Sequence, residues 1–384
     1  MAVDFAHYAG REPAFVKHTF LDKYLPALIA RVGTYYESFV YVDGFAGPWK
    51  SVAGEAFADT SFGIALKHMT AQKAYFATRG RQLQMKAFLV EKSPATFAGL
   101  QKAVEAFPEI ECCPLLGQME QHVPDILAGI SRQAFSFALI DPKGFPDMEP
   151  IMGLIRRANS EALVNFMFDF ANRFAGTQLI PALEKWLSRD GETTWREQVD
   201  RLSKHEREDK LEQLAVEKLR GEAGFTFAPV ISVDKPLHDR TLYKLIFLTR
   251  HSTGLKVFRD SEHKALEAQA VSRSQVKADA REAKSGMTEL FGKQMDVPTD
   301  RSSLRLKEGE EIAKAELLSA LRRAGKAGTF WRAIWPPILN STVVTHSRLG
   351  RIANDLRKAR VIDAPGWPSE RKIIPEEDQL LRLF

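Results

Sequence analysis

The chain has 384 residues, 45% of them hydrophobic and 27% charged, which is the composition of a globular protein long enough for two domains. It holds no apolar run long enough to cross a bilayer and no signal-peptide pattern at its start, so a cytoplasmic protein is expected. The net charge is +5, and residues 301–384 hold 16 Lys and Arg against 10 Asp and Glu, which predicts either a polyanion contact or a solvated basic face there.

Strands and helices alternate from the start of the chain to about residue 167. The spacing of apolar residues from Phe15 to Ile29 predicts a first, amphipathic helix. Five strand-like runs follow, separated by helical stretches; the runs are 39–42, 84–90, 111–116, 135–140 and 161–167. Because this alternation is typical of a doubly wound parallel sheet, we expect an α/β fold of the Rossmann-like class.

The only two cysteines, Cys112 and Cys113, are adjacent in the third of these runs. Neighbouring residues of a strand point to opposite faces of the sheet. No set of residues has the spacing of metal ligands, so we expect neither a disulfide framework nor a metal site.

Beyond residue 167 the alternation ends. The long, charged stretch Leu179–Glu222 predicts a helical insertion at about residues 175–225. Two later runs, Tyr243–Thr249 and Leu255–Phe258, predict an antiparallel hairpin at the end of the sheet. Nucleotide-binding dehydrogenases lack such a hairpin, whereas methyltransferase sheets commonly end with one. The fold expected is therefore a class I methyltransferase sheet.

The sequence divides into two predicted domains, residues 1–290 and 307–384, joined by a linker at 291–306. The second domain shows the three helices and two strands of a winged helix; these are 311–323, 329–334, 347–359, 361–362 and 373–374. Four arginines lie on or beside its third helix and are expected to neutralise nucleic-acid phosphates: Arg348, Arg351, Arg357 and Arg360. Winged helices also dock proteins, so a protein partner is the alternative.

The first site signal is Asp43-Gly44-Phe45-Ala46-Gly47, directly after the first predicted strand. Rossmann-type sheets bind ligands at the carboxyl ends of their strands, and glycines allow a close approach of the backbone. The Gly-x-x-Gly spacing lacks the third glycine of the dinucleotide fingerprint, and the chain has no Gly-x-x-x-x-Gly-Lys-Ser/Thr phosphate loop. A nucleoside that carries an amino acid fits this turn better, and a ligand-free bend remains the alternative.

Two acids mark the ends of later strands. Glu91 ends the second run, where it is placed to accept hydrogen bonds from both ribose hydroxyls of a nucleoside; a surface acid at a helix N-terminus is the alternative. Asp141-Pro142 ends the fourth run. In amino-group methyltransferases an Asp/Asn-Pro-Pro-aromatic motif at this point binds the target amine, and Phe145 is the candidate aromatic here. A capping turn is the alternative for Asp141.

Several segments, taken in order, resemble the three-Cys-motif partner proteins, from about residue 14 to the C-terminus. These segments are Val16-Lys17-His18 with Lys23-Tyr24-Leu25, Tyr41-Val42-Asp43-Gly44-Phe45-Ala46-Gly47-Pro48, Val90-Glu91-Lys92, Ile140-Asp141-Pro142, Val164-Asn165-Phe166-Met167 with Asn172-Arg173-Phe174, and Tyr243-Lys244-Leu245-Ile246-Phe247-Leu248-Thr249. That family consists of bacterial and phage-associated proteins with a methyltransferase domain, encoded beside a radical-type three-cysteine protein and often carrying a winged-helix tail. The resemblance implies S-adenosylmethionine as cofactor and a three-cysteine-motif protein as partner.

The resemblance also extends the cofactor site. Lys17-His18 is similar to a motif of a ribosomal RNA adenine methyltransferase family, in which the lysine helps hold the cofactor's carboxylate. It implies that Lys17 or His18 binds the methionyl end, with a surface lysine beside a packed histidine as the alternative. Lys92 and Gly117, which follow the second and third runs, complete the expected cofactor site.

Three functions stay open, of which the third is methyl transfer to a protein or a small metabolite. The first is methyl transfer from S-adenosylmethionine to a nucleic-acid base amine, with Asp141 orienting the amine. The second is a non-catalytic protein that retains the methyltransferase fold and binds nucleic acid or a partner. The chain departs from the family at two points: Lys143-Gly144 stands where the family has Phe-Gly, and Thr60-Ser61-Phe62 where it has Gly-Ser-Pro. Lys143-Gly144 motivates the second function. The first departure puts base stacking by that loop in doubt.

Overall fold

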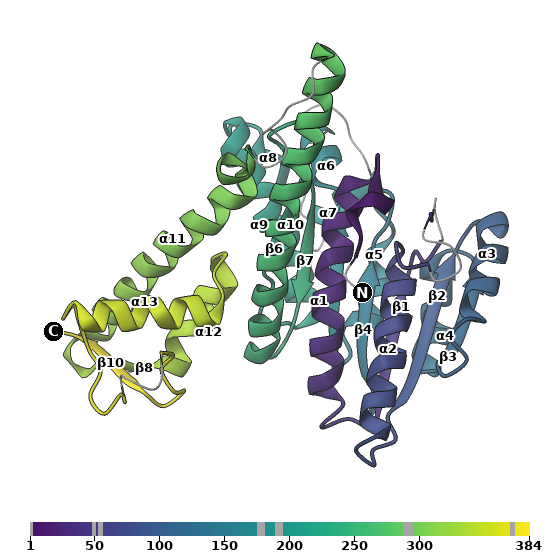
Figure 1. Ribbon diagram of the computed structural model, residues 1–384. Coiled ribbons are helices and arrows are strands. Elements are labelled where there is room, and N and C mark those ends of the chain that lie inside the picture. Colours follow the sequence, from purple (N-terminus) through teal and green to yellow (C-terminus); the bar gives the residue numbers. More distant parts are fainter. Residues whose placement is uncertain are drawn as a thin grey trace. The chain divides into compact units, whose positions relative to one another are not determined.

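The computed structural model in Figure 1 describes residues 3–47, 51–52, 57–174, 181–188, 195–286, 295–368 and 373–384. The chain forms two compact units, Met1–Arg250 and His251–Phe384, and each is described by itself. Within these described ranges, no helix combines the length and the apolar character needed to cross a membrane.

The first unit is built on a seven-stranded sheet with strand order β3-β2-β1-β4-β5-β7-β6. Its strands are β1 (Ser38–Asp43), β2 (Gln84–Glu91), β3 (Glu111–Leu116), β4 (Phe135–Ile140), β5 (Ser160–Phe166), β6 (Val230–Asp234) and β7 (Thr241–Leu248). Strands β1 to β5 pair in parallel, whereas β7 runs antiparallel between β5 and β6. A mostly parallel α/β sheet with an antiparallel end is thus confirmed, and it is compatible with the Rossmann-like class.

Helices connect these strands. They are η1 (Phe5–Tyr8), α1 (Glu12–Val32), α2 (Ser61–Ala77), α3 (Pro94–Val104), α4 (Met119–Ala128), α5 (Met148–Ile155), α6 (Phe168–Phe174), α7 (Pro181–Leu187), α8 (Trp195–Val199) and α9 (Lys204–Ala223). Helices α7 to α9 fall in the predicted insertion, of which residues 175–180 and 189–194 lie outside the described residues.

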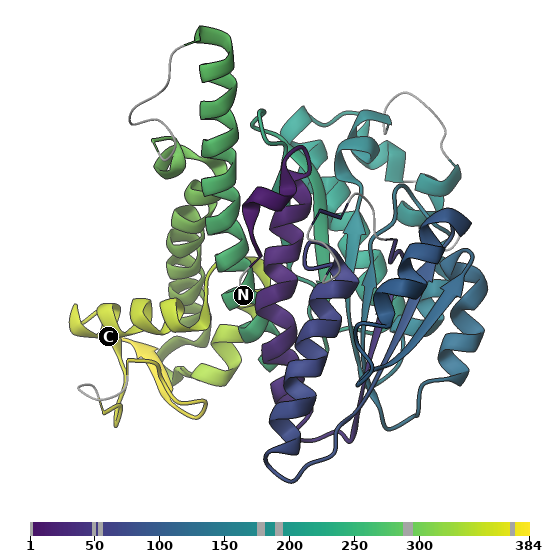
Figure 2. The same cartoon turned by 45° about the vertical axis from the view of Figure 1, so that its right-hand side comes forward.

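Both faces of the sheet are covered by helices. On one face Tyr24 of α1 packs against Phe137 of β4 and Phe247 of β7, with ring centroids 5.6 and 5.2 Å apart, and α2 lies beside α1 (Figure 2). On the other face the core includes Ile126 of α4 and Ile151 of α5. Every residue of β4 is consequently buried, which explains its continuous apolar sequence.

The helices that follow the parallel strands begin with strong capping residues. The side chains of Thr60, Ser93 and Asp147 accept hydrogen bonds from backbone N–H groups in the first turns of α2, α3 and α5. The carboxyl ends of parallel strands share one edge of a sheet, so these caps place the helix N-termini at that same edge. Polar groups from distant parts of the sequence therefore gather there.

The partner of β7 differs from the prediction. The run Leu255–Phe258, expected as a strand, lies within helix α10 (Ser252–Ser285), and β6 pairs with β7 instead. A short apolar run does not distinguish a strand from a helix by its periodicity. Leu255, Phe258 and Leu266 are buried at helical spacing, and it is this longer pattern that forms the apolar side of α10.

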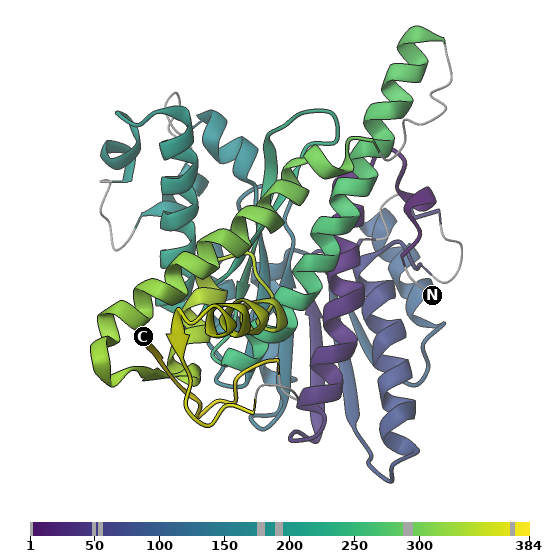
Figure 3. The same cartoon turned by 60° about the vertical axis from the view of Figure 1, so that its left-hand side comes forward.

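The second unit contains α10, three further helices and a three-stranded antiparallel sheet in the order β8-β10-β9, shown in green to yellow in Figure 3. Its remaining elements are η4 (Val297–Thr299), α11 (Arg301–Ala324), η5 (Gly325–Ala327), β8 (Thr329–Phe330), α12 (Trp331–Ser341), α13 (His346–Lys358), β9 (Ile362–Asp363) and β10 (Leu380–Leu383). Helix α11 contacts α10, α12, α13 and β10, so it lies at the centre of this unit.

The boundary between the units lies earlier than predicted. The units divide after Arg250, whereas the sequence predicts a linker at 291–306, of which 291–294 lie outside the described residues. Asp300 caps α11 and pairs with the buried Arg273 of α10 at 2.7 Å. The described part of this segment, from residue 295, thus includes the N-terminal cap of α11 and its ion pair with α10. The predicted return strand at 373–374 is also wrong, because β10 is the strand that pairs with β8 and β9.

Acidification is expected to destabilise the second unit through His346. Trp331 Nε1–H donates to His346 Nε2 at 3.2 Å, which requires a neutral ring. Burial, together with nearby Lys256, lowers the pKa of His346 to about 4 and outweighs the opposite effect of Glu377. A histidine in the unfolded chain titrates near pH 6.5. The contribution of the neutral His346 ring to the free energy of unfolding is therefore complete above that pH and is lost as the pH falls toward 4. Calorimetric melting midpoints should therefore decline over this interval. His346→Gln should flatten the decline, and an equally steep decline in that variant would contradict this assignment.

Candidate functional site

A cavity of about 830 Å³ lies at the edge of the sheet where β1, β2, β4 and β5 end. The predicted site residues that line it are Lys17, His18, Gly44, Phe45, Gly47, Glu91, Lys92, Gly117, Asp141, Pro142 and Phe145. Two others, Asp43 and Ala46, are fully buried and do not line it. The structure thus brings together side chains that the sequence separates by more than a hundred residues.

Asp43 holds the turn after β1 in shape. Its Oδ1 accepts a hydrogen bond from Phe45 N at 3.1 Å, and its Oδ2 accepts from Ser61 Oγ at 2.7 Å and Tyr41 O–H at 3.1 Å. Complete burial raises the pKa of the Asp43 carboxyl group. Asp43 therefore acts on the cavity through Phe45 and Ser61, which do line it, rather than by touching a ligand in this conformation.

Gly44 makes room for a side chain of the protein. A Cβ atom at this position would lie 1.9 Å from Met119 Sδ. Met119 begins α4 and lines the cavity beside the turn. The glycine therefore has a packing reason in this structure: it lets Met119 form part of the cavity wall. Gly44 lines the cavity as well, so the close approach of a ligand to its backbone stays a prediction.

Glu91 presents a carboxylate to the cavity from the end of β2. The residue is 4% exposed, and its Oε1 accepts a hydrogen bond from Ser93 N at 2.7 Å. Among the described residues, no other hydrogen bond or ion pair engages this carboxylate. Gly117 closes the neighbouring loop, since its N–H donates to Glu91 O at 3.0 Å and its φ of 143° suits glycine alone. Glu91 therefore keeps acceptor capacity for a ligand.

Asp141 is held from two sides. The ammonium group of Lys17, on α1, forms an ion pair with Asp141 Oδ2. Asn165, at the end of β5, donates from Nδ2 to Asp141 Oδ1 at 2.6 Å. The carboxylate is thereby fixed at the mouth of the cavity with a side-chain exposure of 21%.

His18 lines the cavity as a neutral ring. Burial, together with the charges of Lys17 and Arg11, holds the pKa of His18 well below its usual range. Its Nδ1 lies 2.9 Å from the hydroxyl group of Tyr8, whose pKa is raised mainly by burial. A protonated tyrosine that donates to Nδ1 leaves Nε2–H as the remaining donor of the ring.

The loop after β4 leads into an aromatic cluster. Phe145 lies with its ring centroid 5.9 Å from Phe166, 5.7 Å from Phe170 and 5.5 Å from Trp186. Trp186 Nε1–H also donates to Pro146 O at 3.0 Å. These contacts hold the ring of Phe145 in place as part of the cavity wall. Lys143, in the same loop, is exposed.

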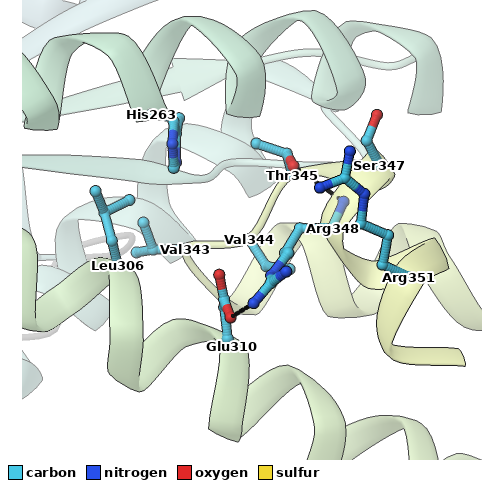
Figure 4. A pocket seen from close by; sticks show the side chains of 9 residues that line it. All are labelled: His263, Leu306, Glu310, Val343, Val344, Thr345, Ser347, Arg348 and Arg351. Atoms are coloured by element: carbon cyan, nitrogen blue, oxygen red, sulfur yellow. Dashed lines mark hydrogen bonds and ion pairs between the residues drawn. The ribbon is translucent and has the colours of Figure 1, made fainter. Parts of the chain in front are cut away.

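Arg348 and Arg351 are two of the three predicted nucleic-acid residues that lie on α13, in the second unit. They line a pocket of about 330 Å³ together with Thr345 and Ser347 (Figure 4). The guanidinium group of Arg348 points to Glu310 of α11, 2.6 Å away, and this pairing raises the pKa of Arg348. Arg351 is exposed and is the more open of the two to an anion.

The other two arginines differ from each other. Arg357 packs its guanidinium group 4.9 Å from the ring of Trp367 and donates to Asn354 Oδ1 at 3.2 Å. Arg360 is exposed just beyond α13, where it adopts a φ of 56°. Arg348, Arg351 and Arg357 line one hollow of about 650 Å³, whereas Arg360 does not take part in it.

Some residues of the cavity were not predicted as site residues. Asn165 lies within the fifth predicted run, one residue before the end of β5, so the strand-end rule does not select it, although it belongs to the segment Val164–Met167 that carries the sequence resemblance. Arg11, paired with Asp59 at 2.5 Å, also lines the cavity, and no sequence motif marks it. Tyr243 of β7 lines it too; it opens the segment Tyr243–Thr249 of the sequence resemblance but was not singled out as a site residue. Across the described part of the chain, no group of His, Cys, Asp or Glu side chains is arranged to hold a metal ion.

Comparison with known proteins gives little. No family model matches the chain, and no curated protein matches it. A solved structure of a Legionella pneumophila protein, assigned to the family model DUF519, aligns with 65% of this chain and 86% of its own at 10% sequence identity and a TM-score of 0.32. A TM-score this low supports no statement about fold or function.

Proposed function

We propose that this chain is an S-adenosylmethionine-dependent methyltransferase that acts on a base amine of a nucleic acid. The observation that carries the proposal is Glu91, a buried carboxylate with acceptor capacity left open at the end of β2. An ionised acceptor at this point suits the two ribose hydroxyls of a nucleoside. The cavity of about 830 Å³ also falls in the range of roughly 300–1,000 Å³ that is usual for small-molecule sites.

The sheet topology favours a methyltransferase over a dehydrogenase. The order β3-β2-β1-β4-β5 is shared with dinucleotide-binding sheets, which continue with a further parallel strand. Here the antiparallel β7 follows, as in methyltransferase sheets. The turn after β1 also lacks the glycine pattern that holds a pyrophosphate group.

The residues of the cavity suit the parts of S-adenosylmethionine. Glu91 would accept from the ribose, and Lys17 with His18 Nε2–H would donate to the carboxylate of the amino-acid end. Bound S-adenosylmethionine supplies a methyl group on a sulfonium centre. The protein's own contribution is to fix the two reactants in line and to exclude water around them.

Asp141 is the residue proposed to receive the acceptor amine. A bound cofactor would supply the methyl group to the amine nitrogen, and the proton that the amine gives up would pass by way of Asp141 to solvent. By accepting a hydrogen bond from the amine, Asp141 orients the nitrogen lone pair and eases that proton loss. Pro142 shapes the loop that carries Asp141, and Phe145 offers an apolar surface close by.

We assign the second unit to the winged-helix class and nucleic-acid binding. Its order of three helices, α11 to α13, and its sheet of β8, β10 and β9 support that class. The hollow lined by Arg348, Arg351 and Arg357 supports a phosphate contact. A three-cysteine-motif protein is the partner that the sequence resemblance adds.

Two measurements test the proposal. Calorimetric titration of cofactor-free protein with S-adenosylmethionine should show saturable binding, and its absence would overturn the proposal. Incubation with methyl-labelled S-adenosylmethionine and separate pools of DNA, transfer RNA, ribosomal RNA and protein should then label a nucleic-acid pool. Binding without label in any pool would favour the alternative, a non-catalytic protein that retains the fold.

A further inference from the structure

One ion pair joins the two halves of the cavity. Lys17 comes from α1, on the side of the cavity that also carries His18, whereas Asp141 ends β4 and is bonded to Asn165 at the end of β5. Among the described residues, Asp141 is the only partner of the Lys17 ammonium group.

Lys17 is also the most buried cation of the cavity wall. It is 8% exposed, whereas Lys92 and Lys143 are exposed to solvent and Arg11 is engaged by Asp59. Charge interactions strengthen as water is excluded, so an anion that enters beside α1 gains most from Lys17. In this structure the Lys17 ammonium group is engaged by the carboxylate of Asp141.

We propose that Asp141 is an internal competitor for Lys17, and that the carboxylate of the cofactor's amino-acid end draws Lys17 away from it. Cofactor binding then frees one oxygen of Asp141 for the acceptor amine. Asn165 is a positioning residue, because its bond to Asp141 Oδ1 keeps the carboxylate in place when Lys17 leaves. This inference rests on the proposed function and adds an order of events: cofactor first, acceptor second.

Competition of this kind has a thermodynamic signature. Removing the negative charge of Asp141 releases Lys17, so any ligand whose carboxylate binds Lys17 should bind more tightly. A ligand with the same nucleoside and no carboxylate should be indifferent to the change. A general loosening of the fold changes the affinities for both ligands alike. The difference between the two changes in affinity therefore reports the competition alone.

Calorimetry with two probes tests the inference. S-adenosylhomocysteine carries the amino-acid carboxylate, and 5′-methylthioadenosine lacks it. Asp141→Asn should tighten binding of S-adenosylhomocysteine about three- to tenfold, the size of a partly exposed ion pair, and leave 5′-methylthioadenosine unchanged. Lys17→Met should weaken the first probe and spare the second. Asp125→Asn, an exposed position on α4, is the matched charge control and should change neither.

The outcomes separate the two proposals. If neither probe binds the wild-type protein, the proposed function itself fails. If both probes bind and Asp141→Asn leaves the affinity for S-adenosylhomocysteine unchanged or lower, Lys17 binds both carboxylates at once or neither of them. The competition is then disproved, whereas the proposed cofactor site is not. Equal tightening of both probes also overturns it, because the effect is then unrelated to the carboxylate. Should Lys17→Met fail to fold, the Asp141→Asn comparison decides alone.

Discussion

Asp141→Ala should reduce methyl transfer by about 10²- to 10⁴-fold, the usual contribution of a positioned acid–base group, while S-adenosylmethionine stays bound. The carboxylate is fixed between Lys17 and Asn165 at the end of β4, so the substitution removes the only group proposed to orient the acceptor amine. Single-turnover rates with labelled cofactor and the nucleic-acid pool that accepts label measure the effect.

The variant Asp141→Asn separates the charge of this side chain from its capacity to accept a hydrogen bond. An amide of the same size still accepts one hydrogen bond but carries no charge, so its rate should lie between those of the wild type and Asp141→Ala. Thermal melting of each variant shows whether the loss of the Lys17 ion pair unfolds the protein. If the folded Asp141→Ala protein transferred methyl groups at the wild-type rate, Asp141 would have no role in the reaction.

Glu91→Ala should weaken binding of S-adenosylmethionine by about a hundredfold or more. Hydrogen bonds to an ionised group are worth about 1.5–3 kcal/mol each, and Glu91 is proposed to accept two of them from the ribose. Adenosine should lose affinity by a similar factor, because the contact is to the nucleoside and not to the amino acid. Calorimetric titration with both ligands measures the change.

Two controls accompany Glu91→Ala. Glu91→Gln keeps the acceptor that Ser93 N requires and should lose less affinity. Glu105→Gln removes the same charge from the exposed end of α3 and should leave binding unaltered. Undiminished adenosine binding in a folded Glu91→Ala protein would show that the ribose does not contact this carboxylate.

The strand-end residues could be predicted from the sequence because their signals are local. A strand that is buried on both faces reads as a short apolar run, and the polar residue at its end is visible without knowledge of its neighbours. Asp43, Glu91 and Asp141 were identified in this way. Parallel pairing then brings Glu91 and Asp141 to one cavity, as the shared edge of a doubly wound sheet requires.

The partners of these residues could not be predicted. Nothing in the sequence near Lys17 shows that its ammonium group reaches Asp141, 124 residues away. Nor does Gly44 show that Met119 fills the space beside it. Such contacts depend on how α1 and α4 pack on the sheet, which is a property of the assembled layers and not of either segment.

The same distinction between local signals and contacts of distant segments explains which parts of the fold were predicted wrongly. By itself the sequence determined an α/β sheet, its first five strands and their chemically important ends, because hydrophobic periodicity within a segment selects strand or helix. Only the tertiary structure decided that β6 and not Leu255–Phe258 pairs with β7, and that the boundary follows Arg250. Strand pairing and the grouping of helices are choices among segments distant in the chain, and their free energies come from burial that exists only once the segments meet.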